Sequence, residues 1–349
     1  MWNWKHKAIS LRIGNLRIST SFSNRRSRNL CWDSSEGSTM GRSVLILTAI
    51  LFFIVFASGC STKDIAIKKI ANILASGSNV FASDEDPEFV KVAIPFSLKL
   101  MESLLKEVPA HESLLLATSS GFAQYAYAFI QQEADVLEEI DFSASREKRK
   151  RAARLYLRAR DYGMRGLEIR HRDFEEVLWE DSELALSSTS IEDVPFLYWT
   201  ATAWAGAISM SKDNPDLISD LPIVEAMIAR AFELDESFDY GALHSFLISY
   251  EMIRPNSSGN PELRARGHFN RALQLSQNRL ASPMVTMAES VSIQKQNRQE
   301  FEELLSQALQ IDANHHPEWR LVNIIMQRRA RWLLSRTDEL FLSIPKERE

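Results

Sequence analysis

Cysteine is nearly absent from this 349-residue chain, which contains only Cys31 and Cys60. The sequence after residue 60 therefore has no thiol, and it can form no disulfide within itself. Its stability must come from an apolar core, and thiol catalysis and cysteine-ligated metal sites are excluded there.

Familiar catalytic motifs are also missing. The chain has no His-Glu-x-x-His, no Gly-x-Ser-x-Gly and, with only 12 glycines, no glycine-rich phosphate loop. His315 and His316 are adjacent in a turn before Pro317, and neighbouring helical side chains point about 100° apart. We interpret them as loop histidines rather than metal ligands. The sequence thus predicts a protein that is not an enzyme and that has no cofactor or metal.

The charge is distributed unevenly. Of the 41 basic and 46 acidic residues, eight basic and two acidic residues precede Cys60, which leaves a net charge of −11 for the remainder. An acidic body argues against a nucleic-acid partner.

Residues 40–59 have the pattern of a secretory signal. Residues 1–39 show no helical or strand period, so we interpret them as a non-native or disordered upstream extension, with Met40 as the initiator. Arg42 is followed by an apolar run from Val44 to Ala57, which is shorter than the roughly 20 residues of a membrane-spanning helix.

The end of this signal resembles a bacterial lipobox, Ala57-Ser58-Gly59-Cys60, although Ala57 stands where Leu is usual. The resemblance implies that Cys60 is lipidated; the alternative is a membrane-buried thiol in an uncleaved anchor. Ser61, rather than Asp, follows Cys60, so we expect a periplasmic protein anchored by lipid to the outer membrane. Residues 60–86 are then the lipidated N-terminus and tether.

Residues 87–349 are predicted to be an all-helical domain. One pattern recurs: Val224-x3-Ile228-x2-Ala231, Ala265-x3-Phe269-x2-Ala272 and Phe301-x3-Leu305-x2-Ala308. Ala231, Ala272 and Ala308 are spaced 41 and 36 residues apart, which is typical of repeated helical hairpins. The predicted fold is all-α, with hairpins stacked into a tetratricopeptide-like superhelix.

A stripe of arginines follows one predicted helix, from about Ser145 to Ile169. Its members recur at steps of 3, 4, 7 and 7, which places them on one face: Arg151, Arg154, Arg158, Arg165 and Arg172. One interpretation is a solvated face that is neutralised by the acidic segments on either side. The other is a docking surface for an acidic partner or for lipid headgroups.

Arg329 lies in the apolar sector of the last predicted helix, from Trp319 to Arg336. A charge there must be paired, and we expect a carboxylate such as Glu251 or Asp312 to be its partner. It is either a structural ion pair or part of a ligand site. Candidate partner or ligand contacts are Tyr250, Glu251, Trp319, Arg329, Arg154 and Arg158.

Five segments together resemble the T component of tripartite ATP-independent periplasmic (TRAP) transporters: Asp86-Pro87-Glu88, Pro95-Phe96-x-Leu98-Lys99, Phe246-Leu247-Ile248-Ser249-Tyr250-Glu251, Ala265-Arg266-x-His268-Phe269-x-Arg271-Ala272-Leu273 and Gln327-Arg328-Arg329-Ala330-Arg331-Trp332-Leu333-Leu334. The resemblance implies a periplasmic lipoprotein that forms a homotrimer, with a pore through each helical subunit. It also implies docking with the transporter's solute-binding protein, and binding of a small hydrophobic or carboxylate ligand.

A second hypothesis is a structural envelope lipoprotein that scaffolds a protein assembly through its helical repeats. A continuous apolar channel, lined by aromatic residues such as Tyr125, Tyr250 or Trp319, would favour the transport hypothesis. A solid core with a concave outer groove would favour the scaffold.

Overall fold

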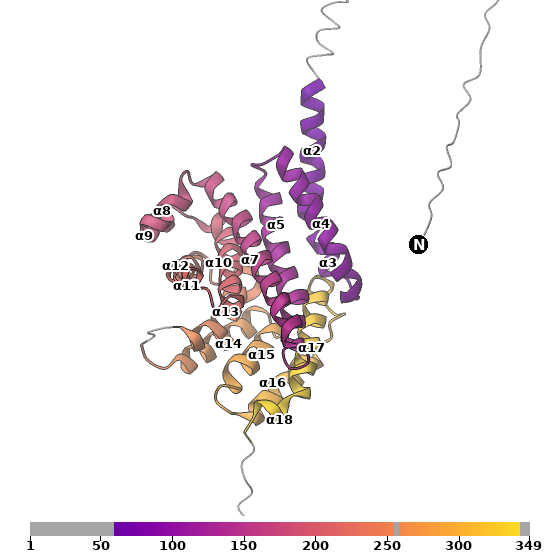
Figure 1. Cartoon of the computed structure of the whole chain (residues 1–349), viewed down its shortest axis with the longest axis vertical. Helices are drawn as coiled ribbons and strands as arrows, with labels where there is room; N and C mark the ends of the chain where they lie inside the picture. Colours follow the sequence, from indigo (N-terminus) through magenta and orange to yellow (C-terminus); the bar gives the residue numbers. More distant parts are fainter. Residues whose placement is uncertain (1–58, 255–257, 343–349) are drawn as a thin grey trace, which may run out of the picture. The chain divides into compact units, whose positions relative to one another are not determined.

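The computed structural model describes residues 59–254 and 258–342, and these residues form helices and connecting segments without any strand (Figure 1). The predicted all-α class is confirmed. The chain divides into two compact units, Met1–Gly59 and Cys60–Glu349. The predicted extension and signal peptide belong to the first unit and lie, apart from Gly59, outside the described residues.

The second unit begins with three helices: α2 (Gly59–Ser76), α3 (Ser78–Ala82) and α4 (Pro87–Glu107). Most of the predicted tether is therefore helical. The side chain of Asp86 caps α4, because it accepts hydrogen bonds from the backbone N–H groups of Glu88 and Phe89 at 3.0 and 3.1 Å. Pro87 occupies the first turn, where its missing N–H costs least.

The helical stretch from Glu112 to Leu137 contains a π-helical segment. Its parts are α5 (Glu112–Tyr125), the π-helix η1 (Ala126–Gln131) and α6 (Gln132–Leu137). Its partner, α7 (Phe142–Arg170), packs on α10 (Val194–Met210) through small residues. A Cβ atom on Gly166 would lie 2.0 Å from the ring of Phe196, so only glycine allows this close approach.

Short helices connect α7, α10 and the repeats that follow. They are α8 (Phe174–Glu180), α9 (Ser182–Ser187), the 3-10 turn η2 (Ile191–Asp193) and α11 (Pro215–Ile218). The first copy of the repeat lies on α12 (Leu221–Leu234).

The remaining elements are α13 (Phe238–Ile253), α14 (Pro261–Leu275), α15 (Ser282–Met287), the π-helix η3 (Ala288–Ser292), α16 (Arg298–Gln310), the 3-10 turn η4 (Pro317–Trp319), α17 (Arg320–Ser335) and α18 (Thr337–Leu340). The backbone of α13 is left-handed from Asp239 to Gly241, so its regular part starts afterwards. Ala231, Ala272 and Ala308 lie on α12, α14 and α16 and are fully buried, as the repeat predicts. The superhelix and the pore stay predictions.

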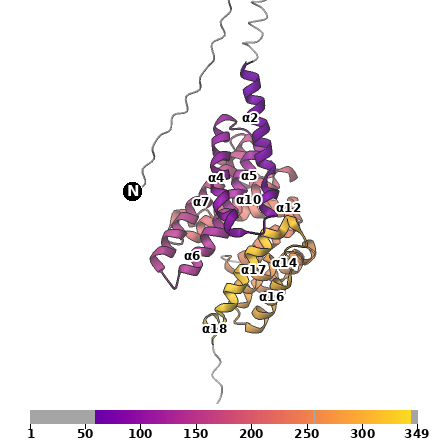
Figure 2. The same cartoon turned by 90° about the vertical axis from the view of Figure 1, so that its right-hand side faces the viewer.

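The buried apolar side chains form two cores. The first contains residues from α2 to α13 together with Ile325 of α17, and Trp204 is among its largest fully buried side chains. The second contains residues from α13 to Phe341, which follows α18, and includes the fully buried Phe301 and Leu305. Figures 1 and 2 show the helices from α14 to α18 gathered on one side of the bundle that contains α4, α5, α7 and α10.

Candidate functional site

Arg329 connects α17 to α6 and to η3 through ion pairs. It lies on α17, is 8% exposed, and its Nη1 atom forms an ion pair with Oδ2 of Asp135 at 3.0 Å. Its Nη2 donates to Glu289 of η3, and its Nε donates to the other carboxylate oxygen of Glu289 at 3.3 Å. Arg329 is paired with carboxylates, as predicted, but the predicted partners Glu251 and Asp312 were wrong. Glu251 pairs with Arg264 instead, because α14 rather than α17 packs beside that part of α13.

The charges of this cluster are linked. Asp135 also pairs with Arg149 at 3.1 Å, and Arg149 pairs in turn with Glu138 at 2.8 Å. Burial alone would lower the pKa of Arg329, but Glu289 and Asp135 raise it above its usual value, and the side chain stays charged. Burial raises the pKa of Asp135, which Arg329 and Arg149 oppose. Within the described residues, each arginine of the cluster is paired with carboxylates, and this geometry favours the structural role.

Aromatic residues surround this cluster. The guanidinium of Arg329 lies 4.3 Å from the centre of the Trp332 ring, and that of Arg336 lies 4.9 Å from it. Burial, followed by the charge of Glu289, raises the pKa of Tyr127 to about 12, so its hydroxyl stays neutral. Tyr127 and Glu289 lie in the two π-helical segments, a conformation that is frequent at functional sites.

Tyr250 and Glu251 are both buried on α13, but they have different partners. The Tyr250 hydroxyl donates to Glu225 of α12, and the ring stacks on Phe246. Oε2 of Glu251 accepts from Nε of Arg264 at 2.6 Å. These contacts tie α13 to the helices on either side of it, which accounts for both residues without a ligand.

Trp319 lies in η4, where its ring meets the ring of Tyr240 edge-on at 4.7 Å. Tyr125, the third predicted channel residue, is buried beside Phe129. The three aromatic residues thus have separate neighbours. Whether they line a channel stays a prediction, as do the proposed roles of Tyr250, Glu251 and Trp319.

A pair formed by the buried His244 and the partly buried His268 was missed by sequence reasoning. Nδ1 of His244 on α13 lies 2.9 Å from Nδ1 of His268 on α14, so one nitrogen donates and the other accepts. Burial lowers the pKa of His244, and the proximity of His268 lowers it further. Burial also lowers the pKa of His268. The spacing of 24 residues across a predicted hairpin was the available signal.

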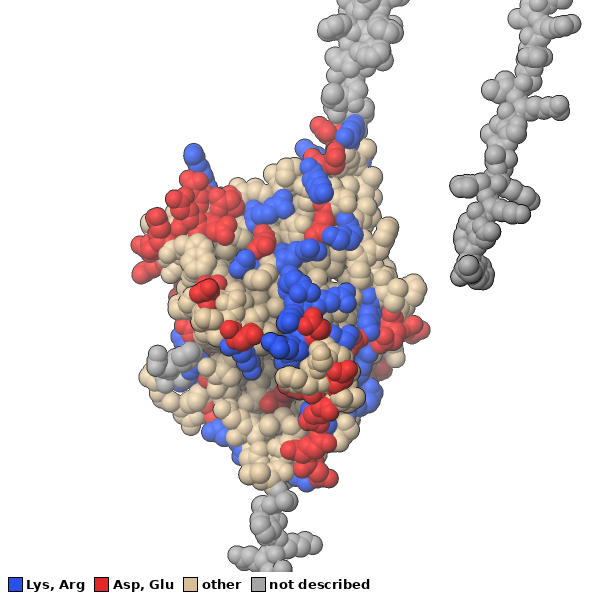
Figure 3. Space-filling model, viewed as in Figure 1, with Lys and Arg blue, Asp and Glu red and all other residues tan. Residues whose placement is uncertain are grey.

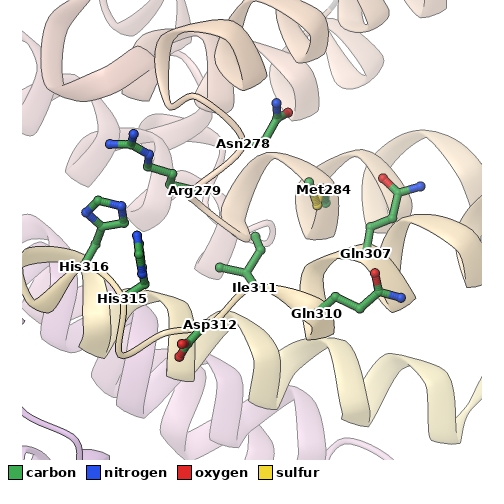
Figure 4. A pocket seen from close by; sticks show the side chains of 9 residues that line it. All are labelled: Asn278, Arg279, Met284, Gln307, Gln310, Ile311, Asp312, His315 and His316. Atoms are coloured by element: carbon green, nitrogen blue, oxygen red, sulfur yellow. The ribbon is translucent and has the colours of Figure 1, made fainter.

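A surface pocket of about 430 Å³ opens beside α16 (Figure 4). Figure 4 shows Asn278 and Arg279 entering from the segment after α14, and Gln307 and Gln310 from α16. The other lining residues are Met284, Ile311, Asp312, His315 and His316. His315 and His316 therefore border a pocket, although no cluster of three or more His, Cys, Asp or Glu in the described part of the chain could hold a metal ion.

The predicted arginine stripe is exposed along α7 and just beyond its end. Figure 3 shows the basic side chains running along this helix and acidic side chains gathered over α8 and α9. Nε of Arg158 lies 3.5 Å from Glu102 of α4. In the part of the chain that the structure describes, Arg151 and Arg154 have no carboxylate within 4.0 Å. The side chain of Cys60 lies outside the described residues.

A second exposed surface lies on α4. Phe89, Val92 and Phe96 recur at steps of 3 and 4 and are 65%, 78% and 75% exposed. Monomeric soluble proteins rarely expose contiguous apolar patches of large size. Sequence reasoning predicted an all-helical domain for residues 87–349 but did not predict that this face would be uncovered.

The model of the family described as TRAP transporter T-component matches residues 83–341, which includes every element from α4 to α18. The chain belongs to the TRAP transporter T-component family. A relative, an uncharacterized protein of Treponema pallidum (strain Nichols), is 30% identical over 303 residues, which are 82% of this chain and 94% of the relative. T-component membership confirms the resemblance and implies an accessory role in TRAP transport, in association with such a transporter.

Proposed function

We propose that the protein is a periplasmic lipoprotein accessory component of a TRAP-type secondary uptake transporter, and that it binds the transporter's solute-binding protein. The observation that carries the proposal is the family match, which spans almost the whole helical body. The exposed apolar residues of α4 and the exposed arginines of α7 support a role in binding other proteins, because exposed apolar and charged surfaces are typical of protein-protein contacts.

The proposal places the protein in the periplasm, anchored to the outer membrane through lipid on Cys60. Helix α2 runs from Gly59 to Ser76 and includes Cys60, so a lipid on Cys60 would be attached at the N-terminal end of the helical body. Within the described residues, no helix has the length and apolar character needed to cross a membrane. A lipid anchor would thus place the body at the membrane surface.

The proposal also includes a homotrimer and a small hydrophobic or carboxylate ligand. The exposed apolar stripe of α4 supports self-association, because a contact between copies would remove it from water. The pocket beside α16 supports ligand binding, since its volume falls within the range of small-molecule sites. It offers apolar contacts from Met284 and Ile311 and a cation from Arg279.

The test uses the soluble body from Ser61, which contains both apolar cores. The body is immobilised and exposed to the purified TRAP solute-binding protein of the same organism. A solute-binding protein from an unrelated transporter is the control. Saturable binding of the first protein alone supports the proposal. If neither protein binds, and only envelope assembly proteins are recovered from a periplasmic extract, the scaffold hypothesis replaces it.

A further inference from the structure

The arginine face consists of Arg151, Arg154, Arg158, Arg165 and Arg172, all exposed, on α7 and just after its end. We propose that this face is the surface to which an acidic surface of the solute-binding protein docks. The inference rests on the proposed function, because it names the contact through which that partner is bound.

The members of the arginine face differ in their ion pairing. Arg158 lies 3.5 Å from Glu102, and Arg172 lies 3.3 Å from Asp173. Several other basic residues of α7 also have nearby carboxylates: Lys148 with Glu133, Arg149 with Glu138 at 2.8 Å, Lys150 with Glu147 at 2.9 Å and Arg160 with Asp161 at 2.7 Å. Arg151 and Arg154 have none within 4.0 Å among residues 59–254 and 258–342. Like charges three and four residues apart repel each other on a helix, so an external acidic group would relieve this repulsion.

Aromatic rings hold part of the face in place. The guanidinium of Arg158 lies 5.3 Å from the centre of the Phe122 ring, and that of Arg165 lies 5.2 Å from the Tyr162 ring. The two rings are themselves parallel, 6.1 Å apart, and the Tyr162 hydroxyl donates to Glu102 at 3.1 Å. Arginine is enriched among the residues that dominate binding at interfaces. Because the rings already restrict Arg158 and Arg165, these side chains lose less conformational entropy when a partner binds.

The size of the face suits a protein partner. From Arg151 to Arg172 the chain would advance about 32 Å as a helix. That length is close to the width of a standard interface, which buries roughly 800 Å² on each partner. The planar, forked guanidinium also matches a carboxylate in a bidentate arrangement.

The acidic segment beyond α7 argues against an anionic membrane as the partner. Its exposed carboxylates belong to Asp173, Glu175, Glu176, Glu180, Asp181 and Glu183. Figure 3 shows them beside the upper end of the basic stripe. An extended anionic membrane surface facing α7 would repel this segment, whereas a protein can confine its acidic groups to the arginine face.

The test compares two double charge reversals in the body from Ser61. Arg151→Glu with Arg154→Glu changes the arginine face without breaking an ion pair of the described structure. Lys212→Glu with Arg331→Glu is the control, because both residues are exposed and the net charge changes equally. Binding to the purified TRAP solute-binding protein is measured at about 50 and 300 mM salt, where screening differs. Thermal melting checks that both variants are folded.

We expect the reversal on α7 to weaken binding at least tenfold at low salt, and the control to change it less than twofold. Wild-type binding should weaken with salt more steeply than binding of the α7 variant. Equal affinities of the α7 variant and the wild type overturn the inference and leave the proposed function intact. If the wild type does not bind the solute-binding protein, the proposed function fails first and the inference fails with it.

Two further measurements separate other occupants of the face. Co-sedimentation uses vesicles of phosphatidylcholine and phosphatidylglycerol in a 3:1 ratio, and analytical ultracentrifugation follows the oligomer. Loss of vesicle binding by the α7 variant, with unchanged binding of the solute-binding protein, assigns the face to lipid. A changed oligomer with unchanged binding assigns it to a second copy. Either result overturns the inference.

Discussion

Replacing Arg329 by Met should destabilise the fold by roughly 3–4 kcal/mol. Removing one partner of a buried ion pair costs about 3–5 kcal/mol, because the other charge stays buried. The side chains of Glu289 and Asp135 are 33% and 15% exposed, and Asp135 keeps Arg149, so we place this term near the lower end, at about 3 kcal/mol. Loss of the contact with Trp332 adds up to about 1 kcal/mol.

The assay is urea unfolding of the body from Ser61, followed by far-UV circular dichroism. The single variants Arg329→Met and Glu289→Gln are compared with the double variant, which removes both charges. We expect the double variant to lose about 1–3 kcal/mol less stability than the two single variants lose in total, because it leaves no unpaired carboxylate on η3.

Arg331→Met is the matched control for this experiment. Arg331 is exposed on the same helix and has no ion pair in the described structure, so the change should stay within about 0.5 kcal/mol of the wild type. A loss below about 1 kcal/mol for Arg329→Met, or strictly additive losses, would refute the reasoning that these charges form one coupled cluster.

Three other predictions follow from local geometry. Gly166→Ala should destabilise the fold by about 1–3 kcal/mol, because the added methyl group clashes with α10. Gly267→Ala is the control in the same urea assay and should be neutral or stabilising, because no atom lies within 4 Å of the added Cβ. Equal effects of the two variants would contradict the close packing of α7 on α10. In the folded protein, the pKa values of His244 and His268 lie below the unfolded value of about 6.5. The stability that the neutral pair contributes is therefore present above that pH and is lost as the pH falls through the folded pKa values. His268→Gln should flatten the fall in melting temperature between pH 7.5 and 5, and an unchanged slope would show that the histidine pair does not cause it. Val92→Lys with Phe96→Lys should shift the proposed homotrimer toward monomers in analytical ultracentrifugation, because it places charges on the exposed apolar stripe of α4. A trimer that persists in this variant would show that the contact between copies is not on α4.

Helical spacing was the reliable part of the sequence. Apolar side chains at steps of three and four predicted helices that the structure confirms as α12, α14 and α16, and the three marker alanines are fully buried. These features are local, since a small residue on an apolar stripe indicates close packing whichever helix is its neighbour.

What depended on tertiary contacts could not be predicted. The partners of Arg329 come from α6 and η3, and only the packing of those elements around α17 selects Asp135 and Glu289 over Glu251 and Asp312. The π-helical segments were missed for a related reason. Their residues continue the helical pattern of the sequence, so the spacing alone does not reveal the wider turn.

The two cores share structural members, and this affects how the body should unfold. Leu243 of α13 belongs to the first core and Ile248 of the same helix to the second. On α17, the consecutive residues Ile325 and Met326 belong to the first and second core respectively. Neither core can lose its order without withdrawing side chains from the other. The two halves should therefore melt in a single cooperative transition, and their amide protons should exchange through the same global opening.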